Sequence, residues 1–212
     1  MSTVTVVDHP LVQHKLALMR DERTTSKDFR NLLDEIALLM GYEVTRHLPT
    51  KRVEVKTPMT TGTFDVLADD LFTIVPILRA GIGMQAGLLE LMPFAHIGTI
   101  GLYREEHADG SIEIVEYYFK MPKDVDKSRV FIVDPMLATG GSAVAAISSL
   151  KRRGCKNIIF MCLVAAPEGI KVVQEEHPDV DIFTAAIDDH LDKHSYIIPG
   201  LGDAGDRIFG TR

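Results

Sequence analysis

One stretch of this chain decides its fold: Val130-Phe131-Ile132-Val133-Asp134-Pro135-Met136-Leu137-Ala138-Thr139-Gly140-Gly141-Ser142. The first four residues are apolar and mostly β-branched, which is typical of a buried strand that ends at Asp134. The small residues Thr139, Gly140 and Gly141 then favour a turn, and an alanine-rich segment from about Ser142 favours a helix. In this order, several backbone N–H groups and the positive end of a helix dipole point into one concavity. The stretch therefore predicts an anion site, to which the Thr139 and Ser142 hydroxyls add donors.

Four other apolar runs indicate that this strand belongs to a parallel sheet. They show no polar alternation, which is typical of strands buried on both faces, and they cover residues 72–76, 97–102, 158–165 and 182–186. Stretches with helical periodicity lie between these runs, at residues 83–91, 142–153 and 167–177. The alternation predicts an α/β fold, in which a parallel central sheet is flanked by helices and ligands bind at the carboxyl ends of the strands. Arg79, Arg104 and Asp134 fall at such ends.

The N-terminal part of the chain is expected to cover this sheet. Pro10 suits the first turn of a short helix. Thr25 and Asp28 form a capping-box pattern ahead of a longer amphipathic helix, whose apolar stripe should face the sheet. Residues 52–57 alternate polar and apolar side chains and predict, with a segment around Phe64, a half-exposed hairpin.

A second hairpin is expected to project from the sheet. Asp109-Gly110 separates residues 101–107 from the β-rich residues 111–119, and Asp-Gly is a strong signal for a hairpin turn. Arg104 would lie near the base of this hairpin. The pattern therefore predicts a lid that brings a cationic side chain onto an anionic substrate when it closes.

Bulk properties limit the classes of protein that fit this chain. Its 212 residues contain no linker, repeat or low-complexity tract, which predicts a single domain over residues 1–212. The 23 basic and 30 acidic side chains give a net charge of −7, which opposes binding to nucleic acid or to an anionic membrane. Cys155 and Cys162 form a poor disulfide framework, and no apolar run is long enough for a signal peptide or a membrane span. We therefore expect a soluble, cytoplasmic protein with reduced cysteines.

Two further motifs accompany the strand, loop and helix described above. One is Pro76-Ile77-Leu78-Arg79-Ala80-Gly81, and the other is Tyr196-Ile197-Ile198-Pro199-Gly200-Leu201-Gly202-Asp203-Ala204-Gly205-Asp206-Arg207. With residues 130–142, they resemble the pyrophosphate loop, the uracil loop and the phosphoribosyl-pyrophosphate loop of the type I phosphoribosyltransferases, in the variant of the uracil-specific members. The similarity extends from His9-Pro10-Leu11 to the last residues. It implies the fold of that family, with a small hood and a projecting β-hairpin beside the parallel sheet.

The resemblance implies a reaction and a set of residues for it. Phosphoribosyl would pass from phosphoribosyl pyrophosphate to uracil, giving uridine monophosphate and pyrophosphate in pyrimidine salvage. The backbone of residues 138–142 and the Thr139 hydroxyl would hold the 5′-phosphate, and Asp134 would accept from the ribose hydroxyls. Arg79 and Arg104 would clamp the pyrophosphate, since guanidinium groups match phosphate oxygens. The implied substrate contacts are Arg79, Arg104, Asp134, Pro135, Met136, Leu137, Ala138, Thr139, Gly140, Gly141, Ser142, Ile197, Gly202, Asp203 and Ala204, among which Arg79, Arg104, Asp134 and Asp203 are the catalytic candidates.

The resemblance also implies Mg²⁺, which binds phosphate oxygens with few protein ligands. Asp203 is the candidate to contact this metal, directly or through water. Pro135 stands where many relatives carry a second acidic residue, so the metal should depend more on the substrate. Ala138 stands where purine-using relatives commonly carry an aspartate. Uracil would then react as an anion, or would pass its proton to water or phosphate, and both routes stay open.

Uracil is implied to bind against the backbone of Ile197, Gly202 and Ala204. Cytosine would mismatch this pattern of donors and acceptors, at a cost of roughly 1–3 kcal/mol for each buried group left unpaired. The resemblance further implies a homo-oligomer, either a dimer or a larger assembly, and allows a GTP effector. No particular residue is assigned to either property.

Other interpretations of these motifs stay open at this point. Residues 134–142 also suit an ordinary strand-to-helix turn, and Gly81-Ile82-Gly83-Met84-Gln85-Ala86 matches a dinucleotide-binding fingerprint that leaves the other two motifs unexplained. His190 and His194 have a spacing that suits a metal site, but no closed set of ligands surrounds them in the sequence. The alternative functions are a regulator on the same scaffold that binds RNA or DNA, which the net acidity opposes, and an enzyme for another nucleobase.

Overall fold

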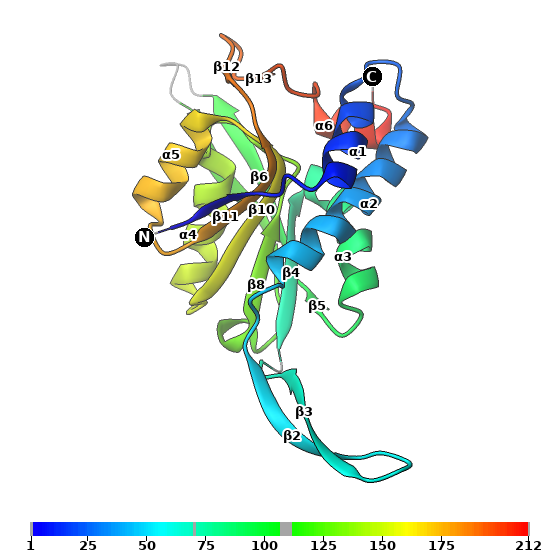
Figure 1. Cartoon of the computed structure of the whole chain (residues 1–212). Coiled ribbons are helices and arrows are strands. Elements are labelled where there is room, and N and C mark those ends of the chain that lie inside the picture. The colour runs from blue at the N-terminus through cyan, green and yellow to red at the C-terminus, as the bar shows by residue number, and fades with distance from the viewer. Residues whose placement is uncertain (1, 70, 107–111, 212) are drawn as a thin grey trace.

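A parallel sheet runs through the middle of the molecule (Figure 1). The computed structural model describes residues 2–69, 71–106 and 112–211. In this part of the chain the sheet contains nine strands. Their bounds are β1 (Val4–Val6), β4 (Phe72–Leu78), β5 (His96–Ile97), β6 (Thr99–Glu106), β7 (Ile112–Lys120), β8 (Arg129–Val133), β9 (Met136–Leu137), β10 (Asn157–Ala165) and β11 (Asp181–Ile187). The pairing of β6 with β7 is antiparallel, and the other pairings of this sheet are parallel. The predicted α/β class is confirmed.

The strand order brings distant motifs to one edge of the sheet. The order is β1-β11-β10-β8-β4-β6-β7, with β5 beside β4 and β9 beside β10. Strands β4 and β8 are neighbours, and because Pro76 lies opposite Val133, β4 extends only two residues past the end of β8. The loops that follow them, which carry Arg79 and Asp134, are therefore adjacent at the carboxyl edge.

Helices cover both faces of the sheet (Figure 1). The α-helices are α1 (Pro10–Arg20), α2 (Ser26–Val44), α3 (Gln85–Leu91), α4 (Gly141–Arg152), α5 (Pro167–Glu176) and α6 (Ala204–Phe209), and two 3₁₀ turns are η1 (Ala80–Met84) and η2 (Val125–Lys127). Helices α4 and α5 lie on one face, and α1, α2 and α3 lie on the other.

Local sequence signals explain where two of the long helices start and end. Thr25 is the N-cap of α2, and its hydroxyl oxygen accepts from the Asp28 N–H at 3.2 Å. Helix α4 carries Lys151 and Arg152 in its last turn, where they complement the negative end of the helix dipole. It stops shortly before Gly154, whose φ of 92° suits a glycine. Both predicted helices are confirmed.

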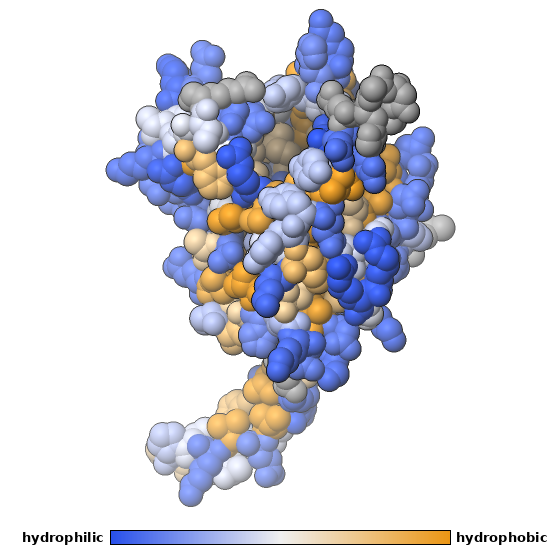
Figure 2. Space-filling view, turned by 180° about the vertical axis from the view of Figure 1, so that it is seen from behind, coloured by the Kyte–Doolittle hydropathy of each residue, from blue (hydrophilic) through white to orange (hydrophobic). Residues whose placement is uncertain are grey.

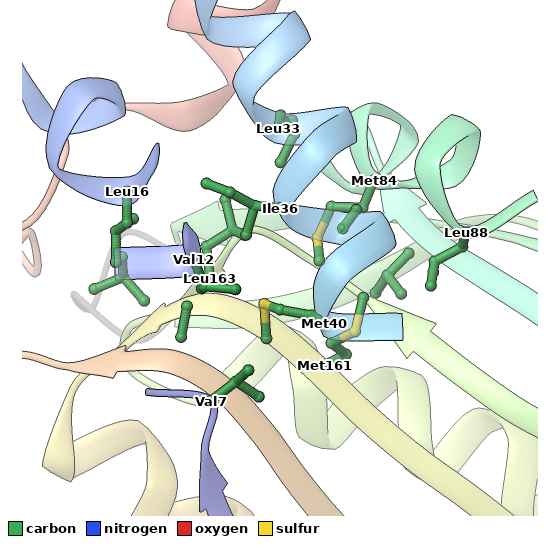
Figure 3. Close-up of a cluster of buried hydrophobic side chains, with 14 of the residues drawn as sticks. Val7, Val12, Leu16, Leu33, Ile36, Met40, Met84, Leu88, Met161 and Leu163 are labelled. Atoms are coloured by element: carbon green, nitrogen blue, oxygen red, sulfur yellow. The ribbon is translucent and has the colours of Figure 1, made fainter. Parts of the chain in front are cut away.

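The core consists of two apolar layers, one on each face of the sheet. Figure 3 shows the layer in which Leu16 and Met40 from the covering helices point toward Met161 and Leu163 of β10. The second layer lies under α4 and α5 and includes Ile147. Full burial of one such side chain contributes roughly 1.5–3 kcal/mol to the free energy of unfolding. These two layers pack the strands whose carboxyl ends carry Arg79 and Asp134.

A long hairpin leaves the body at the end opposite to that edge (Figure 1). It consists of β2 (Thr50–Lys56) and β3 (Thr61–Leu67), and we call residues 50–67 the arm. In the antiparallel register, Val53 lies opposite Phe64 and Arg52 lies opposite Asp65. Since opposite residues share a face and neighbours alternate, the arm has one apolar face and one charged face. The predicted half-exposed hairpin is confirmed.

Some elements differ from the sequence-based prediction. The helix expected over residues 83–91 begins as η1 at Ala80 and becomes α-helical only at Gln85. Residues 4–6 form an additional parallel edge strand on β11. The strand expected at 97–102 is interrupted after Ile97 and continues to Glu106. The Asp109-Gly110 turn lies outside the described residues, but β6 and β7 on either side of it pair as predicted. Among the described helices, we find none with the length and apolar character that crossing a bilayer requires.

Candidate active site

A cavity of about 340 Å³ opens at the carboxyl edge of the sheet. It brings together most of the residues that the sequence singled out, namely Arg104, Asp134, Met136, Leu137, Ala138, Thr139, Gly140, Ser142, Ile197, Gly202, Asp203 and Ala204. Arg79, Pro135 and Gly141 are not among its lining residues. Three loops that are far apart in the sequence thus meet around one space.

The loop between β8 and α4 is anchored by main-chain hydrogen bonds to β10. Asp134 N–H donates to Met161 O at 3.2 Å, and Pro135 O accepts from Leu163 N–H at 3.0 Å. Pro135 is buried behind the loop and does not line the cavity. Strand β9 then pairs with the end of β10, which the sequence-based prediction of a plain turn missed.

The loop ends in a helix N-terminus that can bind an anion. Gly140 has a φ of 86°, which a residue with a side chain rarely adopts. Val144 N–H donates to Gly140 O at 2.9 Å. The N–H groups that precede Val144 in the first turn have no helical partner and lie at the positive end of the α4 dipole. This arrangement suits a phosphate group.

Asp134 lies at the point where β8 opens into the cavity. Burial raises the pKa of its carboxyl group to about 7, while the hydrogen bond from the Met136 N–H and the charge of Arg104 act in the opposite direction. Near neutral pH, the carboxylate is therefore a strong hydrogen-bond acceptor with few waters to compete for it.

Arg104 reaches the cavity from β6. Its Nη2 donates to the Thr139 hydroxyl oxygen at 3.2 Å, so the guanidinium group already touches the loop that precedes α4. Arg104 lies opposite Ile114 in the hairpin of β6 and β7. The predicted position near the base of this hairpin is wrong, because Arg104 lies two pairs before the outermost described pair, Glu106 with Ile112, and five pairs beyond Thr99 with Lys120.

Arg79 follows β4 and points toward the C-terminal helix. The Cζ atom of its guanidinium group lies 5.5 Å from the centre of the Phe209 ring, and the next residue, Ala80, lines the cavity. Gly81 is buried so tightly that a Cβ atom there would collide with Val133 O. The turn after β4 is therefore pressed against the end of β8. The Leu78–Arg79 and Ile198–Pro199 peptide bonds are cis.

The tail contributes the third side of the cavity. Strands β12 (His190–Leu191) and β13 (Ile197–Ile198) form a small hairpin, and the chain returns through Gly202 to α6. Asp203 is the N-cap of α6, and its Oδ1 accepts from Asp206 N–H at 2.8 Å. Asp203 is exposed, and the structure shows no partner for its Oδ2 among the described residues. A metal with few protein ligands fits this free oxygen beside bound phosphates.

Sequence reasoning missed part of this wall. His194 and Ser195 also line the cavity, and Ser195 has a φ of 66°, a left-handed conformation. The tail was expected to be a loop, although residues 204–209 form α6. Asp203 followed by Asp206 was the available N-cap signal. Among the described residues, no group of three His, Cys, Asp or Glu side chains is arranged to hold a metal ion.

Comparisons with known proteins agree with this geometry. The family model of uracil phosphoribosyltransferase matches residues 6–211. The chain is 58% identical over 212 residues to curated uracil phosphoribosyltransferases of Streptococcus pyogenes serotype M5 (strain Manfredo) and Streptococcus sanguinis (strain SK36), and covers 100% of both chains in each case. The solved structure of the AQ2163 protein from Aquifex aeolicus is similar with a TM-score of 0.91 and 33% identity, over 99% of each chain.

Proposed function

This chain belongs to the uracil phosphoribosyltransferase family, and from this premise we propose how its residues carry out the reaction. The reaction is the transfer of phosphoribosyl from phosphoribosyl pyrophosphate to uracil, which gives uridine monophosphate and pyrophosphate. The observation that supports the residue roles best is the meeting of three loops around one cavity, with Asp134 and Arg104 between the helix N-terminus and the tail.

The 5′-phosphate binds at the start of α4 in this proposal. The N–H groups of residues 138–142 and the Thr139 and Ser142 hydroxyls donate to its oxygens, and the helix dipole adds roughly 0.3–1 kcal/mol for an anion. Asp134, at the other end of the loop, accepts from the two ribose hydroxyls. Met136 and Leu137 lie between these two groups and line the wall of the sugar site.

The pyrophosphate binds between the β6–β7 hairpin and the turn after β4. In the reaction, the bond from the anomeric carbon to the pyrophosphate oxygen breaks as the bond to uracil N1 forms, and the pyrophosphate keeps the electron pair. Negative charge therefore grows on the leaving group, where Arg104 and Arg79 neutralise it. Arg104 is already at the phosphate loop, through its contact with Thr139.

Asp203 would hold Mg²⁺ through its free oxygen, directly or through a water molecule. When bound, the metal neutralises charge on the pyrophosphate oxygens. Ala138 places no carboxylate beside the base. The proton of uracil N1 therefore leaves to solvent or to a phosphate oxygen, either before or during the transfer.

Uracil binds against the tail, between Ile197, Gly202 and Ala204. Backbone groups of these residues pair with the two carbonyls and the N3–H of the base. Cytosine inverts part of this pattern, and every buried group left unpaired costs roughly 1–3 kcal/mol. The same wall thus sets both the position and the identity of the base.

We also propose that the protein is a homo-oligomer and that the arm contributes to its interface. Val55, Phe64 and Val66 on the apolar face of the arm are 40%, 47% and 37% exposed, and Met59 near its tip is 92% exposed. Figure 2 shows apolar residues gathered along the arm, below the body of the molecule. A two-stranded hairpin is at most marginally stable alone in water, so a second copy of this chain is the occupant that we propose. The cytoplasmic location and the response to GTP stay predictions.

A product assay tests the proposal. The purified protein is incubated with phosphoribosyl pyrophosphate and uracil, cytosine, hypoxanthine or orotate, each with and without Mg²⁺ and with and without GTP. We expect uridine monophosphate from uracil in the presence of Mg²⁺ and no product from the other three bases. A nucleotide product from cytosine would contradict the base wall as described, and full activity without Mg²⁺ would contradict the role of Asp203.

A further inference from the structure

The tail is held from behind by two residues to which the reaction has assigned no role. Arg20 is the last residue of α1, and Asp188 follows the end of β11. Arg20 Nη1 donates to Asp188 Oδ2 and Arg20 Nη2 donates to Asp188 Oδ1, both at 2.7 Å. Asp188 is only 7% exposed. The pair is therefore a two-pronged, mostly buried ion pair, which has a strongly defined geometry.

The same ion pair binds both backbone groups of Gly200. Arg20 Nη1 donates to Gly200 O at 2.7 Å, and Gly200 N–H donates to Asp188 Oδ2 at 2.8 Å. Gly200 has a φ of 62°, and a Cβ atom there would collide with the carbonyl group of Ile197. Gly200 therefore folds back onto Ile197, which lines the cavity, and the ion pair fixes it in that conformation.

The loop that follows Gly200 has open space on two sides. Gly202 and Asp203 line the active-site cavity and also a second cavity of about 420 Å³ behind the loop. Leu201 O accepts from Arg207 Nη1 at 2.9 Å. The position of this wall thus depends on the hydrogen bonds to Gly200 and Leu201 and on the burial of the Leu201 side chain in the core.

We propose that Arg20 and Asp188 are positioning residues for the nucleobase. By fixing Gly200, they set where Gly202 and Ala204 present backbone N–H and C=O groups to uracil. The pair contacts neither Asp134 nor Arg104, and Asp203 keeps its own anchor as the N-cap of α6, so loss of the pair should raise the KM for uracil much more than the KM for phosphoribosyl pyrophosphate. This inference depends on the proposed placement of uracil against the tail.

Steady-state kinetics of Asp188→Ala, Asp188→Asn and Arg20→Lys test the inference. Asp188→Ala removes every acceptor, and we expect the KM for uracil to rise ~10-fold or more while the KM for phosphoribosyl pyrophosphate stays within about twofold. Asp188→Asn keeps one oxygen for the Gly200 N–H but turns an amide N–H₂ toward Arg20, so its effect should be smaller. Arg20→Lys keeps the positive charge but loses the two-pronged guanidinium geometry, so its effect on the KM for uracil should also be intermediate.

Two control variants separate the possible outcomes. The ion pair of Arg129 and Asp69 measures 2.8 Å, against 2.7 Å for Arg20 and Asp188, and its arginine side chain has the same 23% exposure as that of Arg20, but neither Arg129 nor Asp69 lines the active-site cavity. Asp69→Asn should therefore leave both KM values unchanged. Ala204→Val narrows the base site directly. If Ala204→Val leaves the KM for uracil unchanged, the placement of uracil is wrong.

The inference itself is overturned by a different result. In that result, Ala204→Val raises the KM for uracil, but folded Asp188→Asn and Arg20→Lys either leave this KM unchanged or raise the KM for uracil and the KM for phosphoribosyl pyrophosphate equally. If Asp188→Ala does not fold, as judged by circular dichroism, the two milder variants decide the question.

Discussion

At the scale of single residues, Asp134 combines burial with a need to accept hydrogen bonds. Loss of water raises the pKa of its carboxyl group to about 7, whereas an exposed aspartate titrates near 4. The group therefore changes from carboxylate to neutral acid within the range in which enzymes are usually assayed. A protonated carboxyl group accepts less strongly from ribose hydroxyls than a carboxylate does.

The first prediction follows from this titration. In the wild type, the KM for phosphoribosyl pyrophosphate should rise as the pH falls below about 7, because Asp134 becomes protonated. Asp134→Asn should raise this KM by on the order of tenfold at pH 8 and should remove its dependence on pH. Initial rates at varied donor concentration between pH 6 and pH 8.5 measure both effects.

The free protein provides an independent check of the same pKa. A carboxyl group whose pKa is higher in the folded than in the unfolded state contributes most stability below the unfolded pKa, and this contribution is lost as the pH rises to about 7. Asp134→Asn should therefore gain stability relative to the wild type between pH 4 and pH 7, by at most a few kcal/mol. If the melting temperatures of Asp134→Asn and the wild type differed by a constant amount between pH 4 and pH 7, the raised pKa of Asp134 would be contradicted.

Arg104 carries the second prediction at this scale. Its side chain is exposed and contacts Thr139, so its removal should cost little stability. Arg104→Ala should lower kcat by roughly 10²–10³, because charge on the departing pyrophosphate is no longer neutralised. The KM for uracil should stay within about twofold. Arg52→Ala on the charged face of the arm is the matched control. If Arg104→Ala impaired only the binding of uracil, the proposed role of Arg104 would be refuted.

At the scale of secondary-structure elements, the β6–β7 hairpin is fastened along α4. Ile114 lies against Gly141, the first residue of α4. Further along, Glu116 accepts from the Ser149 hydroxyl and from Arg153 Nη2, and the Arg153 guanidinium lies 3.6 Å from the centre of the Phe119 ring. Strand β7, in which Ile114 lies opposite Arg104, is thus tied to α4, whose N-terminus is our proposed phosphate site.

The third prediction concerns this attachment. Glu116→Gln and Arg153→Ala should loosen the hairpin, so that Arg104 spends less time at Thr139. We expect a several-fold lower kcat and a higher KM for phosphoribosyl pyrophosphate, with little change in the KM for uracil. Arg152→Ala, one residue away and exposed, is the control. Equal kinetics for the Arg152 and Arg153 variants would show that the attachment has no role in catalysis.

The same elements show what the sequence could predict. The strand, loop and helix at residues 130–142 were predictable because an apolar run, glycines and a helical period follow each other within one local stretch. Strand β1 and helix α6 were missed because elements of this length have almost no periodicity of their own. The pairing of Arg20 with Asp188 joins residues 168 positions apart, and no local pattern carries that information.

The candidate site was predictable to a similar extent. The position of Asp134 at the cavity was predictable because it follows a buried parallel strand, at the edge where such sheets bind ligands. Arg104 instead lies inside β6, beyond the predicted end of that strand. Motif resemblance gave no sign of the direction in which Arg79 points, since its contact with Phe209 depends on the fold of the tail. No local pattern pointed to Arg153, because its contact with Glu116 requires the hairpin to lie on α4.

At the scale of the whole molecule, the arm stands apart from the body (Figure 1). Its apolar face has no cover from the rest of the described chain, as the exposure of Phe64 shows. Apolar residues of this kind on a projecting hairpin mark an interaction surface. Our proposal assigns this surface to a second copy of the chain.

The fourth prediction tests this assignment. Phe64→Asp places a charge on the apolar face and should shift the protein toward monomers in sedimentation equilibrium, with a lower melting temperature. Thr63→Asp, on the opposite face of the same strand, is the control and should leave the assembly intact. A wild-type monomer, or an unchanged assembly after Phe64→Asp, would refute the proposal.

The close contact of Gly81 with Val133 O has a consequence for the way this enzyme can change. Main chain packs on main chain there, so the backbone rather than side chains sets the distance between the turn after β4 and the loop after β8, which we propose to bind the donor. The tail, by contrast, separates two cavities at Gly202 and Asp203, and side chains of Arg20, Asp188 and Arg207 hold its backbone. Selection or engineering for a new base can therefore act on the tail, while the backbone spacing of the proposed donor site stays unchanged.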